Sequence, residues 1–370
     1  MTTITYIVSD IDKALAFEWI ATHLDLSRFR LSFILLNPGP SVLEDFLKQR
    51  GIPVYRVTCR GKKDWPAAWW HTYRLLRKLR PSAVHCHLLQ ANIIGLSAAK
   101  VAGVPKRIYT RHHSSLHHVY HAKGVFWDKR ANRQATHIVA ISGMVRDILL
   151  QWEKADPEKI TLIPHGFELD VFSEVSAGRV AAFRKRHNVP EGSKVIGVIS
   201  RFTEWKGVQY IIPAFERFYK DNTDAVLLLM NARGDYETAL LGLLQHLPAS
   251  AYRVIPFESD IAAAYHSMSV FVHVPIDAHS EAFGQIYVEA LAAGVPSVFT
   301  PSGIAADFIT DRANALLVPF KDHDAIYEAI VQLSTDKDLG RHLVVNGKAS
   351  VRERFALKTM IGSLEALYES

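Results

Sequence analysis

Short apolar runs recur along the whole chain and alternate with longer stretches in which apolar residues follow helical spacing. In the first half the runs occupy residues 4–9, 31–36, 54–57, 83–86, 107–110, 137–140 and 159–163. In the second half they occupy residues 194–200, 225–230, 252–255, 270–274, 296–299 and 315–318. Such runs are typical of parallel strands buried on both faces, and their crossovers are helical stretches such as 65–80 and 207–220. The pattern predicts an α/β protein with parallel sheets covered by helices.

The alternation breaks near residues 164–192, where a polar helix lies between two segments rich in Pro and Gly. We therefore expect two doubly wound, Rossmann-like domains, residues 1–170 and 171–357, and a length of 370 residues fits two domains. The last helical segment, residues 358–370, follows after the second domain has enough elements to close. It is predicted to pack back on the first domain.

Composition narrows the class of protein. A hydrophobic fraction of 49% with 22% charged residues is that of a globular protein with a substantial core. Two cysteines, Cys59 and Cys86, are too few for a disulfide framework and favour a reducing, cytoplasmic location. The N-terminus has the pattern of a strand and not of a signal peptide, and no apolar run is long enough to predict a transmembrane helix.

The formal net charge is +6, and 18 histidines add positive charge in mild acid. This balance suits phosphorylated substrates, nucleic acid or an anionic bilayer. The basic residues form no block that matches a nucleic-acid-binding module, so we do not expect nucleic acid as a partner.

The first chemical motif is the loop from Ser200 to Gly207, which directly follows an apolar strand and contains Arg201 and Lys206. In open α/β sheets, ligands bind beyond the carboxyl ends of the strands, where this loop lies. An Arg offers a planar fork and a Lys a point charge, and together they suit a diphosphate. Taken alone, the loop is more often a solvated basic turn than a diphosphate site.

The second motif runs from Ser280 to Pro296 and contains Glu281 and Glu289. Gly284 permits a close backbone approach, and the apolar residues after it predict a helix that ends at Gly294. The N–H groups of such a helix start are available to a phosphate or sugar hydroxyl. The two carboxylates can bind opposite ends of an extended nucleotide sugar. The alternative is one glutamate at a helix start and one solvated glutamate.

The order and spacing of four segments resemble the retaining glycosyltransferase family 4, also called glycosyl transferases group 1. They are Arg201 with Lys206, Glu281 with Glu289, Ala293-Gly294-Val295-Pro296, and Pro164 to Phe172. The resemblance covers the C-terminal half closely and the N-terminal half loosely. It implies the GT-B fold, with two facing Rossmann-like domains and a cleft between them.

The resemblance also implies roles for single residues. Arg201 and Lys206 are expected to hold the donor diphosphate, and Glu281 to contact the transferred sugar. Further donor contacts are expected from Glu289 at the ribose, from Phe257 within the segment 254–258 at the base, and from Phe283, Gly284 and Gln285 at the sugar. In the first domain, His112 matches the family's histidine beside the reacting sugar, and His113 is the rival assignment.

The family retains the anomeric configuration, which implies front-face attack with the leaving phosphate taking the acceptor proton. The catalytic set is then His112, Arg201, Lys206 and Glu281, which act by positioning and electrostatic stabilisation. Because a cationic clamp can replace a divalent ion, no metal or other cofactor is expected; the nucleotide sugar is a substrate.

Three places depart from the family's pattern. The turn after the first strand reads Ser9-Asp10-Ile11-Asp12-Lys13 and contains no glycine, so Lys13 would substitute as a charge. Ala282 stands where the family often has glycine, and residues 231–234 replace a glycine-acidic-glycine turn. None of these changes removes Arg201 or Lys206, so an active enzyme is expected.

Two histidine clusters suggest either a metal or the acceptor. His85-Cys86-His87 ends a predicted strand, and a second run contains His112, His113, His117, His118 and His121. Neither has a second cluster of matching ligands, so we predict no metal site. His85, His87 and His113 are instead predicted to line an acceptor pocket that titrates near neutral pH.

Residues 62–80 combine aromatic side chains with basic residues at both ends. Trp69, Tyr73, Leu76 and Arg80 follow helical spacing, as in an interfacial membrane helix. The alternative is an ordinary helix whose aromatics pack on the sheet. The first interpretation predicts a peripheral protein on the inner face of the plasma membrane.

These observations together predict a retaining transferase that moves a hexose-type sugar from a UDP- or GDP-sugar to a glycan or lipid-linked acceptor in cell-surface polysaccharide biosynthesis. One alternative is a sugar-nucleotide epimerase of the same architecture, which would release no sugar to an added acceptor. The other is a non-catalytic glycan-binding scaffold, which the altered first turn favours and the intact Arg201, Lys206, Glu281 and Glu289 disfavour.

Overall fold

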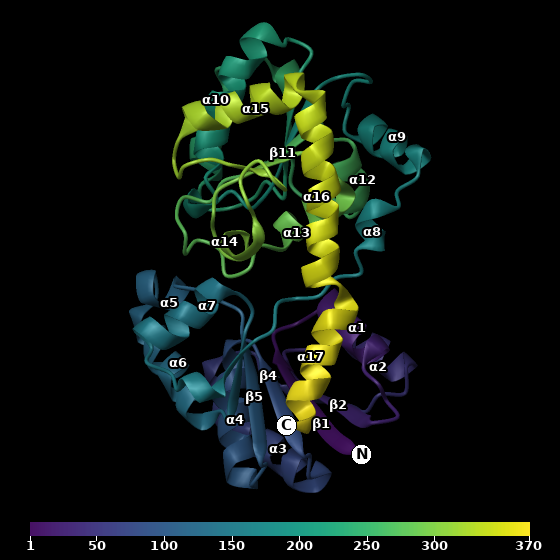
Figure 1. Ribbon diagram of the computed structural model, residues 1–370. Coiled ribbons are helices and arrows are strands. Elements are labelled where there is room, and N and C mark those ends of the chain that lie inside the picture. The colour runs from purple at the N-terminus through teal and green to yellow at the C-terminus, as the bar shows by residue number, and fades with distance from the viewer. The chain divides into compact units, whose positions relative to one another are not determined.

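The computed structural model describes residues 1–370 as two compact units (Figure 1). Unit 1 comprises Met1–Phe167 with Leu357–Ser370, and unit 2 comprises Glu168–Ala356. Each contains one fully parallel sheet with helices on both faces, and all thirteen predicted strands are present. The predicted α/β class with two Rossmann-like domains is confirmed.

Unit 1 contains a seven-stranded sheet of order β3-β2-β1-β4-β5-β6-β7. Its strands are β1 (Thr2–Ser9), β2 (Phe29–Asn37), β3 (Val54–Thr58), β4 (Ala83–His87), β5 (Lys106–Arg111), β6 (His137–Ala140) and β7 (Ile160–Leu162). Its helices are α1 (Leu15–His23), α2 (Val42–Gln49), α3 (Trp65–Leu79), α4 (Leu89–Ala102), α5 (Leu116–Val119), α6 (Ala122–Gln134), α7 (Gly143–Asp147) and α17 (Leu357–Glu369).

The terminal helix α17 completes the core of unit 1 (Figure 1). Its apolar side chains join a buried cluster with α1, α2 and the strands, while α3 and α4 cover the other face of the sheet. The Gly166 N–H donates to the sulfur of Met360 at 3.0 Å, and the Leu357 N–H donates to the Phe167 carbonyl at 3.0 Å. The Lys106 ammonium donates to the Leu367 carbonyl at 2.9 Å, which stabilises the negative end of the helix dipole.

Unit 2 contains a six-stranded sheet of order β10-β9-β8-β11-β12-β13. Its strands are β8 (Val195–Ile199), β9 (Val226–Met230), β10 (Tyr252–Ile255), β11 (Val270–His273), β12 (Ser297–Phe299) and β13 (Leu316–Leu317). Its helices are α8 (Asp170–Ser173), α9 (Ala177–Arg186), α10 (Val208–Asp221), α11 (Glu237–Leu244), α12 (Ile261–His266), α13 (Gln285–Ala293), α14 (Ala305–Phe308), α15 (His323–Thr335) and α16 (Lys337–Phe355).

The strand order of each sheet reverses direction at one place. In unit 1 this is between β1 and β4, and in unit 2 it is between β8 and β11. Loops that leave two such strands diverge to opposite faces of the sheet and open a crevice at the carboxyl ends, where ligands bind. None of the helices combines the length and apolarity that a membrane crossing requires.

Candidate active site

The loop after β8 brings a cationic group to the switch point of unit 2. Arg201 follows the strand, is exposed, and its guanidinium forms no hydrogen bond or ion pair within the protein. Gly207 begins α10 with φ +74°, and a Cβ there would lie 1.9 Å from the Val274 carbonyl oxygen. Because only glycine fits that contact, the close approach of this loop to β11 depends on Gly207.

Lys206 and Glu281 form an ion pair at the same edge of the sheet. His273, at the end of β11, donates from Nε2 to Glu281 Oε1 at 3.0 Å. The Glu281 N–H donates to the Ser302 hydroxyl at 3.1 Å, which fixes the backbone beside the carboxylate. Burial would raise the pKa of Glu281, but the Lys206 charge and the hydrogen bond from His273 lower that pKa to about 2. Glu281 is therefore an ionised acceptor for hydroxyl groups at neutral pH.

The helix α13 starts beside this cluster and not at Glu281. Its first residue is the exposed Gln285, and Gly284 precedes it with φ +84°. A Cβ at Gly284 would lie 2.4 Å from the Tyr287 ring, so glycine is required at this helix start. The buried Phe283 packs edge-on against Phe355. The Tyr287 N–H donates to the Gly284 carbonyl at 3.1 Å. The first N–H groups of a helix generally have no acceptor within it, which makes a helix start suitable for binding an anion.

Glu289 lies one turn into α13 and accepts a hydrogen bond from the Tyr265 hydroxyl at 3.0 Å. Burial raises the pKa of Glu289 to about 7, and the hydrogen bond from Tyr265 only partly opposes this. Glu281 and Glu289 thus have opposite pKa shifts on one short segment. Their difference follows from their partners, because Glu281 faces a lysine and Glu289 a neutral phenol.

The remaining predicted donor contact is Phe257, which follows the edge strand β10. Its side chain is 77% exposed, whereas the adjacent Glu258 is buried and paired with Arg186 and His187. A large exposed aromatic side chain next to an anchored residue provides a stacking surface. In the turn at residues 231–234, a Cβ on Gly234 would lie 2.0 Å from the Phe202 carbonyl oxygen, so this turn packs tightly on the Arg201 loop.

Comparison with known proteins agrees with this geometry. Residues 180–350 match the family described as Glycosyl transferases group 1, and residues 20–171 match Glycosyltransferase Family 4. The chain belongs to glycosyltransferase family 4, the group 1 glycosyltransferases.

Relatives and solved structures agree with the family assignment. The capsular polysaccharide biosynthesis glycosyltransferase CapM of Staphylococcus aureus is 27% identical over 304 residues, which is 80% of this chain and 78% of CapM. An Escherichia coli UDP-Gal:alpha-D-GlcNAc-diphosphoundecaprenol alpha-1,3-galactosyltransferase is 25% identical, covering 86% and 85% of the two chains. The crystal structure of Anabaena HepE in complex with UDP and glucose superposes with a TM-score of 0.84 at 17% identity and covers all of both chains. That superposition confirms the GT-B fold of this transferase.

In unit 1 of the transferase, the turn after β1 is held by a side chain in place of glycine. Asn37 accepts from the Ile11 N–H at 3.0 Å and donates to the Ile11 carbonyl at 2.5 Å. Asp10 adopts φ +52°, and Lys13 is exposed. Asn37 therefore stabilises the tight turn, and Lys13 leaves a charge in solvent beside it.

His112 lies at the carboxyl end of β5, next to the switch point of unit 1. Its Nε2 is 3.0 Å from His87 Nδ1, and its ring stacks on His165 with centroids 5.6 Å apart. Burial and the neighbouring His165 hold the pKa of His112 well below its ordinary value, so it is neutral at pH 7. Leu88, directly after His87, has φ +73° and ψ 162°, a region that side chains rarely occupy. Backbone strain of this kind concentrates at functional sites.

His85 is enclosed in unit 1, with no exposed surface. Its Nδ1 is 2.8 Å from the Tyr368 hydroxyl and its Nε2 is 2.8 Å from the Thr110 hydroxyl. Burial lowers the pKa of His85 to about 3, so the ring is neutral. Both nitrogens of His85 thus form hydrogen bonds inside the protein. By contrast, His87 Nε2 is buried without a hydrogen-bond partner, and the side chain of His113 is partly exposed.

Sequence reasoning missed several residues that complete these sites. His273, Tyr265, His165 and Tyr368 each contact a predicted site residue. His273 ends a predicted strand at the ligand-binding edge, a signal that would have identified it. The partners of Glu289 and His85 carry no such local signal.

Proposed function

We propose that this chain is a retaining glycosyltransferase that moves a sugar from a nucleoside-diphosphate donor to a glycan or lipid-linked acceptor. The observation that carries the proposal is the group of Arg201, Lys206, Glu281 and His273 at the start of α13. It combines an unpaired guanidinium, a lysine and free helix N–H groups, which suit a diphosphate, with an ionised carboxylate, which suits sugar hydroxyls.

The named relatives support the class of reaction. CapM is a capsular polysaccharide biosynthesis enzyme, and the Escherichia coli relative takes its acceptor on diphosphoundecaprenol. HepE holds UDP and glucose. We therefore propose a UDP-hexose donor and an acceptor in cell-surface polysaccharide biosynthesis.

In the proposed reaction Arg201 and Lys206 stabilise the charge that builds on the diphosphate leaving group. This electrostatic task needs no divalent ion, because two cations already face the developing charge. Glu281 orients the transferred sugar, Glu289 binds the ribose hydroxyls, and Phe257 stacks on the base. The neutral His112 orients or polarises the sugar, with His113 and His87 on the acceptor side and His85 supporting them from the core.

The test is thermal stabilisation by a panel of nucleoside diphosphates and nucleotide sugars, with and without EDTA. A ligand that binds only the folded state raises the melting temperature. At a concentration one hundred times its Kd it increases the free energy of unfolding by about 2.7 kcal/mol. We expect one nucleotide to stand out, EDTA to leave the shift produced by that nucleotide unchanged, and Arg201→Ala to weaken binding at least tenfold. The Arg201 side chain is exposed and forms no hydrogen bond or ion pair, so we expect its removal to leave the fold intact.

The matched control is Arg233→Ala, because Arg233 is exposed in the loop after the neighbouring strand β9. We expect it to bind the donor normally. If no nucleotide stabilised the protein, the transferase proposal would be refuted and a non-catalytic scaffold would be favoured. Turnover of the donor to an epimer without sugar transfer would favour an epimerase.

We also propose that unit 1 contacts an anionic membrane surface through residues 62–80. In α3, Trp70 is 52% exposed, whereas Trp69 donates to the Ser97 hydroxyl at 3.0 Å and packs toward α4. The exposed Arg74 and Lys78 line a cavity of about 800 Å³ beside β3. One face of the helix thus packs in the protein and the other offers an aromatic ring with basic groups, as interfacial helices do.

A further inference from the structure

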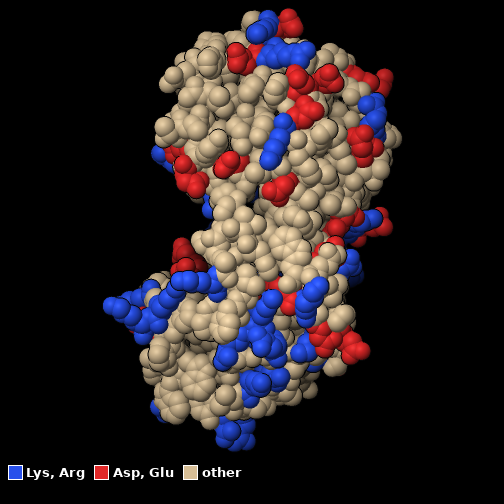
Figure 2. All heavy atoms as spheres, turned by 90° about the vertical axis from the view of Figure 1, so that its left-hand side faces the viewer, with Lys and Arg blue, Asp and Glu red and all other residues tan.

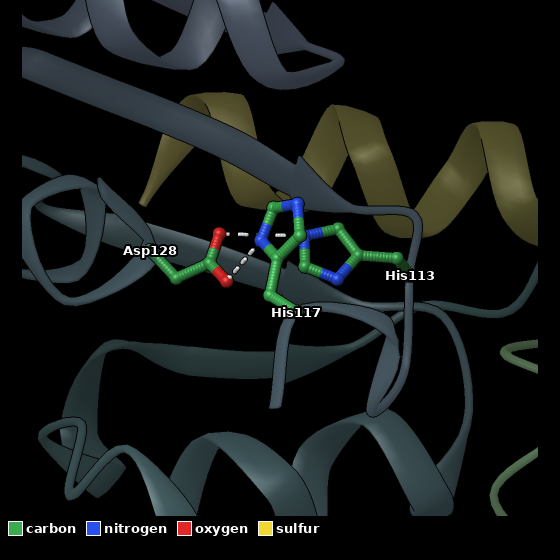
Figure 3. Close-up of side chains that lie close together, drawn as sticks. All are labelled: His113, His117 and Asp128. Atoms are coloured by element: carbon green, nitrogen blue, oxygen red, sulfur yellow. Dashed lines mark hydrogen bonds and ion pairs between the residues drawn. The ribbon is translucent and has the colours of Figure 1, made fainter. Parts of the chain in front are cut away.

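Three side chains converge in unit 1 outside the proposed donor site. His113 lies in the loop after β5, His117 on α5 and Asp128 on α6, and their ligating atoms all lie within 4.8 Å of one another. Asp128 Oδ2 accepts from His117 Nδ1 at 2.6 Å, and Asp128 Oδ1 is 3.3 Å from His113 Nε2. Figure 3 shows both imidazoles directed at the one carboxylate. Three segments are therefore joined at one point.

The charges around this cluster do not balance. Arg111 contacts Asp128 at 3.2 Å and Glu153 at 2.5 Å, and all three side chains are almost completely buried. One guanidinium thus faces two carboxylates, and the other contacts of these carboxylates are imidazoles and an amide. The two buried carboxylates thus outnumber the one guanidinium that contacts them, and a bound cation would offset this difference.

The set of donors is that of a transition-metal site. Two imidazole nitrogens and one carboxylate oxygen, with a fourth position for water, form a recurrent open Zn²⁺ site. Bonds of about 2.0–2.1 Å in a tetrahedron separate ligand atoms by about 3.3 Å. His113 Nε2 lies 3.3 Å from Asp128 Oδ1, which matches that value, whereas His117 Nδ1 lies 2.6 Å from the other oxygen, Oδ2. A rotation of the Asp128 carboxylate that presents one oxygen to both imidazoles would admit the ion.

The surroundings hold the ligands in place. Gly124 lies so close to the His117 imidazole that a Cβ there would be 2.6 Å from its Cγ. Arg111 binds the Asp128 oxygen that faces His113, and the side chain of His113 is 22% exposed. The ring of His117 is thus fixed by packing, Asp128 is oriented from behind, and solvent reaches the cluster from the His113 side.

We propose that His113, His117 and Asp128 bind one Zn²⁺ ion, with a fourth coordination position open to solvent. The ion offsets the excess buried charge and ties the loop that carries His112 and His113 to α6. This site goes beyond the proposed function. It shares His113 with the proposed acceptor side, but the residues proposed to bind the donor belong to unit 2. Donor binding and metal binding can therefore fail separately.

The test uses the full chain, stripped with EDTA, checked for folding by circular dichroism, and supplied with ZnCl₂ in slight excess. After desalting, we expect about one Zn²⁺ per chain by mass spectrometry and a higher melting temperature. His117→Ala and Asp128→Asn should each weaken binding at least about 100-fold. Co²⁺ is a second probe, because the intensity of its visible absorption reports a tetrahedral site independently of stability.

The matched control is His121→Ala, since His121 is exposed, lies next to His117 and is not among the three ligands. Gly124→Ala leaves all ligands present but displaces the His117 ring, so it should lower the affinity for Zn²⁺. A metal content far below one ion per chain, or full retention of Zn²⁺ in both His117→Ala and Asp128→Asn, would overturn the proposal. Equal loss in His121→Ala would mean nonspecific surface binding and would overturn it as well.

Discussion

Single residues in this transferase acquire their chemistry from their partners more than from their type. Glu281 and Glu289 are both glutamates on one short segment, yet the pKa of the first is lowered to about 2 and that of the second raised to about 7. A lysine and a histidine stabilise the ionised form of Glu281, whereas burial against a phenol disfavours ionisation of Glu289. The two carboxylates are therefore suited to different tasks.

The raised pKa of Glu289 predicts a pH dependence of stability. From pH 4.5 to about 7 the unfolded state loses this proton while the folded state keeps it, so the free energy of unfolding falls as pH rises. Above pH 7 the folded state has also lost the proton, so the free energy of unfolding stops falling on account of Glu289. We expect Glu289→Gln to remove this decline and to gain about 3 kcal/mol relative to wild type between these pH values, because one pKa unit corresponds to about 1.4 kcal/mol.

The measurement is urea unfolding at a series of pH values, followed by far-UV circular dichroism. The matched control is Glu328→Gln, because Glu328 is exposed on α15 in the same unit and has no partner. Its difference from wild type should stay constant with pH. Parallel pH profiles for wild type and Glu289→Gln would contradict a buried, protonated Glu289.

At the scale of elements, the last helix of the chain supports the predicted catalytic histidine of the first domain. The Tyr368 hydroxyl on α17 bonds both to Tyr6 on β1 and to His85 on β4. His85 stacks close to His87, with ring centroids 4.3 Å apart, and His87 contacts His112. The C-terminal helix α17 thus holds His85, the histidine of this group that lies deepest in unit 1.

This arrangement predicts a specific cost for removing one hydroxyl. In Tyr368→Phe the buried Tyr6 hydroxyl and His85 Nδ1 each lose a partner, so we expect unit 1 to lose about 1–3 kcal/mol of stability. Six of the seven tryptophans lie within residues 1–167, so tryptophan fluorescence during urea unfolding reports mainly on unit 1. Tyr73→Phe is the control, because that hydroxyl has no partner, and it should change stability by less than about 0.5 kcal/mol. Equal stability of the two variants would contradict the role of Tyr368.

At the scale of the whole molecule, the two units differ in charge. Unit 1 has 25 Lys and Arg against 14 Asp and Glu, whereas unit 2 has 18 against 23. Lys and Arg side chains predominate on the face of unit 1 seen in Figure 2. The net charge of +6 therefore conceals a strongly basic unit 1 and an acidic unit 2. Such an asymmetry favours association of unit 1 with anionic surfaces.

We predict that the chain binds vesicles containing anionic phospholipid and that added salt weakens this binding. Each basic residue near the surface contributes about 1 kcal/mol, so the double variant Arg74→Glu with Lys78→Glu should reduce vesicle binding at least tenfold in a cosedimentation assay. Lys220→Glu with Lys337→Glu makes the same charge change at exposed sites of unit 2 and should have little effect. Equal losses in both double variants would contradict a specific surface on α3.

Local patterning by itself determined the two parallel sheets of this protein. Each of the thirteen strands coincides with a predicted apolar run, and most of these runs are buried on both faces, so their pattern is readable without reference to any other part of the chain. The motifs with Arg201, Lys206, Glu281 and Gly284 were equally readable, because the residues of each motif lie within a few positions of one another in the sequence. Fold class and the candidate donor group were therefore predictable from the sequence.

Only the tertiary structure decided which side chains meet across distant segments. Strand order places β8 beside β11, and that adjacency brings His273 and Glu281 to Lys206. The contact of Tyr368 with His85 spans 283 positions, and Asp128 reaches His113 and His117 from another helix. Hydrophobic periodicity specifies which face of an element is buried but not which element covers it, so these partners followed from packing alone.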